Sequence, residues 1–280
     1  ALKSSIDAFW TASQSLGANA ADPAARSTFR QSGVKLVESM QEAGRQLNSM
    51  ASDINEILTT KVTKVNEISK KIVALNKQIS NFESVQSMPA NDLRDQRDAL
   101  VDELSSLARV TVQEDLEHNY VVQLDGVVLA NGSAYTELKT TVDYDTDLYK
   151  KYNMKTLGIE TNDKPPITLN ITTGEIGALF QSRDSDTSGV KGYRDMLDTI
   201  AQSFLCDFNQ VHREGYGLDN STGTNFFGRD GIQYSDLTSI GKDPTVTATA
   251  NISAPTLNFK SYNSLNASTI SLDVAAINTA

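Results

Sequence analysis

The stretch VNEISKKIVALNKQISNF, residues 65–82, decides the fold of this chain. Its apolar side chains recur at alternating steps of three and four residues, which places them on one stripe of an α-helix. The stripe consists of Val65, Ile68, Ile72, Leu75, Ile79 and Phe82. We predict that this stripe faces the interior of a helical bundle.

A second apolar stripe with the same spacing lies upstream. It consists of Met40, Ala43, Leu47, Met50, Ile54 and Ile57. Asp22 followed by Pro23 predicts a helix start, but Gly33 and Gly44 weaken the part that follows. We therefore expect a continuous helix only from about Arg45 to Phe82, roughly 55 Å at 1.5 Å per residue.

A further helix is expected to fold back antiparallel on the long one. Pro89 breaks the long helix, Asn91 can cap the next one, and Asp92 is placed favourably in its first turn. Arg94 and Asp98 lie four residues apart, and we assign them to an outer, solvated face. The apolar stripe of this helix consists of Leu93, Leu100, Leu104 and Leu107.

The pattern changes from helix to strand after residue 109. Alternating valines precede two strands at 120–124 and 127–130, which meet at a tight Asp125-Gly126 turn. Residues 140–166 are polar and weakly patterned, and 167–171 alternate as a further strand. Helical spacing returns at Gly174 and continues from Val190 to Val211. Residues 233–280 are expected to form short strands of another β module.

These observations predict an α+β fold that is mainly helical. We expect an elongated antiparallel helical bundle (a rod) with an inserted β-hairpin region and a further β module at the C-terminal end. The predicted parts are a first rod segment (1–109), a β-rich outgrowth (110–173), a returning rod segment (174–232) and the start of an outer β module (233–280). The predicted bundle seam consists of Val65, Ile68, Ile72, Leu75, Ile79, Leu100, Leu104, Ile200, Phe204 and Phe208.

Composition excludes several classes of function. The chain of 280 residues has 25 basic against 35 acidic side chains, a net charge of −10, which argues against a nucleic acid or an anionic membrane as partner. No apolar run approaches the roughly 18 residues that a membrane span needs. The single cysteine, Cys206, excludes an internal disulfide framework.

No pattern of residues predicts catalysis, a cofactor or a metal. Cys206 follows an apolar stripe and is interpreted as a small buried filler. His212 closes a predicted helix, where a cation favours the C-terminal end of the dipole. His118 lies in a turn, and the sequence indicates no partner for it. No P-loop and no dinucleotide-binding glycine motif is present. We expect no catalytic residue, no cofactor and no metal ligand.

Three stretches together resemble the flagellar hook-associated protein 1 family. The first contains Phe9-Trp10 and leads into residues 65–79. The second and most specific is ANDLRDQRD, residues 90–98. The third joins GEIGAL (174–179) to FNQVHREGY (208–216) and closes on Asn225-Phe226-Phe227. The order and separations of the three fit the family over about residues 5–228.

The resemblance implies a structural protein, exported without a cleaved signal peptide, that joins the hook of the extracellular bacterial flagellum to its filament. Its implied partners are copies of itself in a ring, the hook protein and the second hook–filament junction protein. The resemblance also implies that one motif caps and clasps the helical hairpin. The motif residues are Asn91, Asp92, Leu93, Asp95, Gln96, Arg97 and Asp98.

Relative to the family, we expect a fragment that lacks both terminal assembly segments and is monomeric in solution. A missing rod helix is then expected to leave an apolar groove along Val65, Ile72 and Ile79. The alternative is a coiled-coil and β binding module, such as an adhesin or a secretion-system tip protein. Strict heptads over more turns would favour that alternative.

Overall fold

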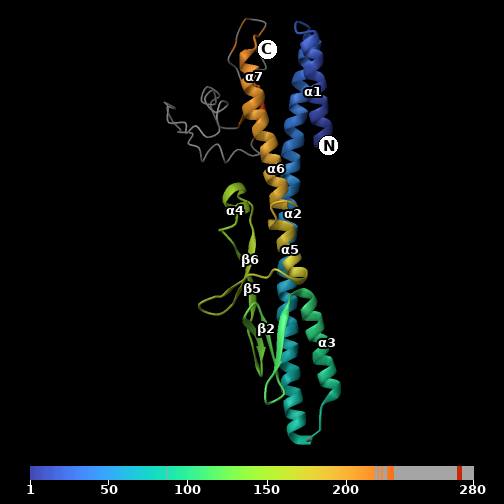
Figure 1. Ribbon diagram of the computed structural model, residues 1–280, viewed down its shortest axis with the longest axis vertical. Helices are drawn as coiled ribbons and strands as arrows, with labels where there is room; N and C mark the ends of the chain where they lie inside the picture. The colour runs from blue at the N-terminus through green and yellow to red at the C-terminus, as the bar shows by residue number, and fades with distance from the viewer. Residues whose placement is uncertain (87, 218–219, 221, 223–225, 230–269, 273–280) are drawn as a thin grey trace. The chain divides into compact units, whose positions relative to one another are not determined.

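The computed structural model describes residues 1–86, 88–217, 220, 222, 226–229 and 270–272 (Figure 1). The chain divides into two compact units, Ala1–Ser49 with Gly192–Ala280, and Met50–Lys191. Helices with small antiparallel sheets confirm the predicted mainly helical α+β class. Most of the β module predicted at 233–280 lies outside the described residues. Its described part is the strand β9 (Ile270–Leu272), which pairs antiparallel with β8 (Phe227–Arg229).

Helix α2 (Pro23–Gln86) contributes to both units. It begins as predicted, since the Asp22 side chain accepts a hydrogen bond from the Ala24 backbone N–H at 3.0 Å. The prediction that it becomes continuous only near Arg45 is wrong, because the helix runs unbroken through Gly33 and Gly44. Each glycine costs about 1 kcal/mol relative to alanine. The burial of neighbouring side chains outweighs that cost. They are Phe29, Leu36, Val37 and Met40.

The packed face of α2 differs from the upstream stripe predicted for it. Met50 and Ile57 are 50% and 45% exposed, whereas Ala51, Asn55 and Leu58 are buried. Met50 and Ile57, which belong to the upstream apolar stripe, therefore do not lie on the packed face. The buried face at this level is built from a small residue and an amide, because Asn55 binds the backbone of a strand there.

In the Met50–Lys191 unit, helix α3 (Asn91–Leu107) lies beside the last part of α2, after the chain turns back (Figure 1). A four-stranded antiparallel sheet follows in the order β1 (Val110–Glu114), β2 (Tyr120–Leu124), β3 (Val127–Asn131) and β4 (Ala134–Tyr135). Asp125 and Gly126 have φ of 48° and 78°. The left-handed conformation of both residues confirms the tight turn between β2 and β3.

A second sheet of this unit was predicted only in part, since β7 (Thr168–Leu169) lies within the strand expected at 167–171 and the other two strands were not expected. The order of this sheet is β5 (Leu138–Val142), β6 (Leu157–Thr161) and β7, and helix α4 (Asp147–Tyr152) lies between β5 and β6 in the chain. The Thr146 hydroxyl caps α4 by accepting from Tyr149 N–H at 3.2 Å. Threonines among the strand residues hid the alternation of this segment from hydrophobic patterning.

The core of this unit lies where α2, α3, both sheets and helix α5 (Gly174–Asp184) meet. It contains the predicted seam residues Val65, Ile68, Ile72 and Leu104 together with strand residues such as Val122 and Leu129, and Leu100 packs against it half-buried. The predicted groove is wrong, since Val65, Ile72 and Ile79 are each 0% exposed and Leu75 is 8% exposed. In this core, Val65 and Ile72 are covered by strand residues together with Leu104 and Leu107 of α3.

The other unit has a separate core. Helices α1 (Leu2–Ala18) and α6 (Val190–Ser203) build it together with the first part of α2, residues 204–205 and residues 226–227. Helix α7 (Asn209–Glu214) follows in the chain. Phe9 is fully buried among Phe29, Phe204, Phe208, Phe226 and Phe227.

The predicted seam is therefore divided between two cores. Phe204 belongs to this second core, and Ile200 and Phe208 pack against it. Phe204–Phe208 form a π-helical turn (η1) between α6 and α7.

None of the helices in the described ranges is both long and apolar enough to cross a membrane.

Candidate functional site

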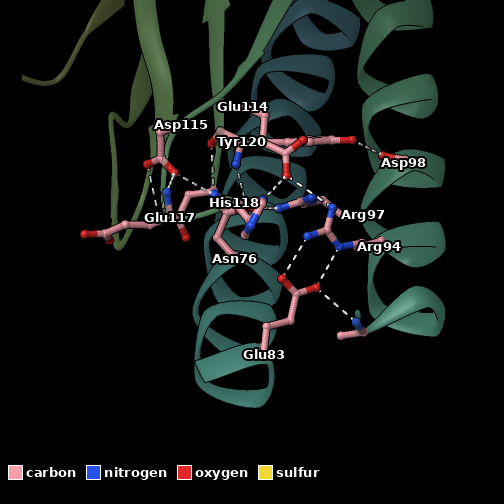
Figure 2. A network of polar contacts seen from close by, with 12 residues as sticks. Asn76, Glu83, Arg94, Arg97, Asp98, Glu114, Asp115, Glu117, His118 and Tyr120 are labelled. Carbon is pink, nitrogen blue, oxygen red and sulfur yellow. Dashed lines mark hydrogen bonds and ion pairs between the residues drawn. The ribbon is translucent and has the colours of Figure 1, made fainter. Parts of the chain in front are cut away.

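A network of polar side chains joins the end of the α2–α3 hairpin to the turn between β1 and β2 (Figure 2). We call it the hairpin-end network. Its members are Asn76, Glu83, Arg94, Arg97, Asp98, Glu114, Asp115, His118 and Tyr120. All of them belong to the Met50–Lys191 unit.

Glu83 holds the start of α3. Its carboxylate accepts two hydrogen bonds from Arg94, at 2.7 Å from Nε and 2.8 Å from Nη2, and one from Ala90 N–H at 2.9 Å. These bonds, first those from Arg94, lower the pKa of Glu83 to about 2. The prediction that Asn91 caps α3 is wrong, because the N-cap residue is Ala90 and no side chain caps the helix. The predicted place of Asp92 in the first turn is confirmed.

Arg94 and Asp98 do not share a face in the way predicted. Arg94 turns toward the hairpin interior, where its Nη1 also donates to Glu114 at 3.2 Å. Asp98 accepts a hydrogen bond from the Tyr120 hydroxyl at 2.7 Å. The pKa of Tyr120 is raised, mainly by burial and to a lesser extent by this hydrogen bond to Asp98.

Arg97 lies at the centre of the network and is fully buried. Its Nη1 donates to the Asn76 Oδ1 at 2.9 Å and to the His118 carbonyl at 2.7 Å. The guanidinium carbon lies 3.4 Å from the centroid of the Tyr120 ring, a cation–π contact. Within the described ranges, the Nε and Nη2 of Arg97 have no hydrogen-bond partner. The buried cation is therefore held by neutral groups that come from α2 and the β1–β2 turn.

Asparagine side chains repeat one contact at four places. Each amide accepts from the N–H of the first residue of a strand and donates to the backbone carbonyl of that residue or, in one case, of the residue two positions earlier. The pairs, with acceptor and donor distances, are Asn76 with Tyr120 (3.0 and 3.0 Å), Asn66 with Leu138 (2.8 and 2.8 Å), Asn55 with Leu157 N–H and the Lys155 carbonyl (3.2 and 2.7 Å), and Asn209 with Phe227 (2.9 and 2.7 Å). An amide offers the donor and acceptor that a neighbouring strand would offer.

A second buried arginine repeats the arrangement at Asn55. Arg183 of α5 is 1% exposed, and its Nη1 donates to the Asn55 Oδ1 at 2.9 Å and to the Leu157 carbonyl at 2.8 Å. Its guanidinium also stacks on Phe180 and binds Asp184 through two nitrogens, each at 2.8 Å. Two Arg–Asn pairs thus fix the first residues of β2 and β6 against α2.

Comparison with known proteins identifies the family of this chain. Residues 1–227 match the family model described as "Flagellar hook-associated protein FlgK helical domain". The chain belongs to this family. The resemblance carried by residues 90–98 and the two other stretches is confirmed.

Flagellar hook-associated proteins of several bacteria are similar to this FlgK-family chain. The chain is 31% identical over 267 residues to flagellar hook-associated protein 1 of Salmonella typhimurium, covering 90% of this chain and 45% of that protein. It is 28% identical over 250 residues to flagellar hook-associated protein 1 of Bacillus subtilis, covering 81% and 48%. It thus spans about half the length of these relatives.

A solved structure shares the fold of this FlgK-family chain. It is that of the flagellar hook junction protein FlgK from Burkholderia pseudomallei, with a TM-score of 0.71 at 29% identity. The match covers 81% of this chain and 40% of that one.

The structure divides the motif of this FlgK-family chain into two faces. Arg97 and Asp98 join the hairpin-end network, Leu93 is half-buried, and the remaining motif residues are exposed. The exposed ones are Asn91, Asp92, Asp95 and Gln96. Sequence reasoning missed Asn76, Glu83 and the inward role of Arg94. The sequence feature that could have identified them is a polar residue placed on an apolar stripe or one position beside it.

The histidines are accounted for by packing. His118 has a partner that the sequence did not indicate, since its Nδ1 lies 3.0 Å from the Glu114 Oε1. His212 lies in the last turn of α7 as predicted, and its ring stacks on Phe208. The predicted burial of Cys206 lies outside what the structure describes. Among the described residues, no group of three or more His, Cys, Asp or Glu side chains is arranged to bind a metal ion.

Proposed function

We propose that this chain is the helical part of a structural subunit at the junction between the flagellar hook and the filament. The proposal rests on the hydrogen-bond partners of the buried polar side chains. Arg97, Arg183 and Asn76 join helices to strands, so their hydrogen bonds hold the fold together. The relatives, named hook-associated protein 1 and hook junction protein, support the location.

The proposed partners follow from that location. They are copies of the same protein in a ring, the hook protein and the second hook–filament junction protein. The proposed route is export to the extracellular flagellum without a cleaved signal peptide. The 280-residue chain itself is proposed to be monomeric in dilute solution, and light scattering that finds a dimer or ring at every concentration would contradict this.

The proposed function involves no catalysis. The motif residues Asn91, Asp92, Leu93, Asp95, Gln96, Arg97 and Asp98 serve to build the hairpin, and no group among them acts on a substrate. The alternative of a coiled-coil adhesin or tip protein is not favoured, because strands and α3 pack on α2 where a coiled coil would keep a helical partner.

Deletion and complementation in the source bacterium test the proposal. Cells without the gene are expected to carry hooks without filaments, and the wild-type gene restores filaments. A variant with Cys206→Ala, His118→Asn and His212→Asn should restore them equally if it folds, as circular dichroism can establish. A folded variant that exports normally and restores no filaments would refute the absence of catalysis.

A further inference from the structure

The turn between β1 and β2 contains a fully solvent-exposed leucine. Leu116 has a relative exposure of 102%, the largest among the exposed apolar side chains of the described residues. Met88, in the α2–α3 connection, is 63% exposed. Met88 and Glu117, the residue after Leu116, line the same open hollow of about 590 Å³. Met88 thus borders this hollow directly, and Leu116 immediately precedes one of its lining residues.

The turn that carries Leu116 is held by its own hydrogen bonds. The Asp115 carboxylate accepts from the backbone N–H groups of Glu117 at 2.9 Å and Asn119 at 2.8 Å, and from the Asn119 side chain at 3.1 Å. Asp115 N–H donates to the Asn119 carbonyl at 2.9 Å. His118 has a φ of 62°, in the left-handed region. The backbone on both sides of Leu116 is thus fixed.

The hairpin-end network ties this turn to the helices (Figure 2). The His118 carbonyl accepts from the buried Arg97, and the His118 ring contacts Glu114, which accepts from Arg94. Arg94 in turn is held by two bonds to Glu83. Because the backbone that carries Leu116 is already ordered, only the leucine side chain has to be ordered when a partner covers it, which favours its use as a binding anchor.

The charge around the anchor indicates the kind of partner. Leu116 lies between Asp115 and Glu117, and Glu114 is close in the chain. The one guanidinium that reaches toward this turn from α3 and lines the hollow, that of Arg94, is already bound by Glu83 and Glu114. The chain as a whole has a net charge of −10, so a second copy is a poor electrostatic match. A pocket with a basic rim is the better match.

We propose that Leu116, together with Met88, is an anchor that inserts into an apolar pocket with a Lys/Arg rim on a different protein of the assembled flagellum. This inference rests on the proposed function. Because the backbone of the turn is fixed, the partner pocket meets one backbone shape. The negative charges of Asp115, which is bound only by neutral donors within the described residues, and of Glu117 attract the basic rim of that pocket.

Site-specific photocrosslinking in intact flagella tests the anchor. The photoreactive residue p-benzoylphenylalanine replaces Leu116, and in a control strain it replaces Ile167, which is 54% exposed in the same unit. We expect an adduct from position 116 to a different flagellar protein, at apolar residues beside Lys or Arg, and none from position 167. Equal adducts from both positions, no adduct, or an adduct to a second copy of this chain would overturn the proposal.

A functional readout accompanies the crosslink. Leu116→Ser is expected to leave the fold unchanged, because the side chain makes no buried contact, and to lower retention of the protein in isolated flagella roughly tenfold. Ile167→Ser should leave retention unchanged. If wild-type protein is found at the junction and Leu116→Ser is retained equally, the anchor is refuted and the proposed function stands. If wild-type protein is absent from the flagellum, the proposed function fails.

Discussion

Replacing Asn76 by alanine is expected to lower the free energy of unfolding of the Met50–Lys191 unit by about 3–5 kcal/mol. The fully buried amide makes two neutral hydrogen bonds with the Tyr120 backbone and accepts one from the charged Arg97. Neutral bonds contribute about 1 kcal/mol each, and a bond to a charged group about 1.5–3 kcal/mol. The loss would also leave Arg97 buried with a single strong acceptor, the His118 carbonyl.

Urea unfolding followed by circular dichroism measures this loss, and amide hydrogen exchange locates it. Exchange at Tyr120 N–H should increase more than at Val122 N–H, because Asn76 accepts directly from Tyr120. Asn81→Ala on the same helix is the matched control, since its side chain is exposed and it should change stability by at most about 0.5 kcal/mol. A loss below about 1 kcal/mol, or equal effects of the two substitutions, would refute the role given to Asn76.

Three other perturbations have distinct expected outcomes. Glu83→Gln should destabilise the same unit by about 1–2 kcal/mol at pH 7. The folded pKa of Glu83 is depressed to about 2 from 4.5, so the stability it provides is present above pH 4.5 and lost as pH falls toward 2. Urea midpoints should therefore fall more steeply with acid in wild type than in the variant, which keeps the lowered pKa values of Glu103 and Asp115. Phe9→Ala should cost about 3–5 kcal/mol in the aromatic core of the other unit, with increased hydrogen exchange in α1 and α6 and unchanged exchange in β2; a uniform increase would argue against two cores. Gly174→Ala should cost about 2 kcal/mol or more in thermal unfolding, because the residue has a φ of 70° and an added Cβ would lie 2.6 Å from the Leu107 carbonyl oxygen, whereas Gly17→Ala, in open space on α1, should be neutral or stabilising.

Regular apolar spacing made the C-terminal half of α2 predictable. The steps through Val65, Ile68 and Ile72 fit a buried helical stripe, and these side chains are buried. The helix start was predictable for a local reason too, because Asp22 and Pro23 suit the first two positions of a helix regardless of what packs later. Strong local signals of this kind predict the helix correctly regardless of its tertiary contacts.

Polar residues on packed faces were not predictable in the same way. Asparagine and arginine are normally exposed, so hydrophobic patterning skips Asn55, Asn76 and Arg97 although all three are buried. Conversely, Met50 and Ile57 belong to a regular apolar stripe, but the helix leaves them half-exposed. What decides these positions is the backbone of a distant strand that needs a donor and an acceptor, and a single segment of sequence does not contain that information.

The hairpin-end residues were predicted only in part. Residues 90–98 were singled out by resemblance, and Arg97 and Asp98 do contact the β1–β2 region. The partner of Arg94 is Glu83, eleven residues earlier on another helix, and not Asp98 four residues later. Spacing along one helix predicts contacts on that helix alone, so a bond between two helices requires the fold.

Immunogold electron microscopy tests the central claim most directly. Antibody raised against the 280-residue chain is applied to flagellated cells of its source bacterium, with cells that lack the gene as the control. The account predicts gold confined to one narrow band between the curved hook and the long filament. Gold spread over the cell body, or found only in the cytoplasm, would contradict it.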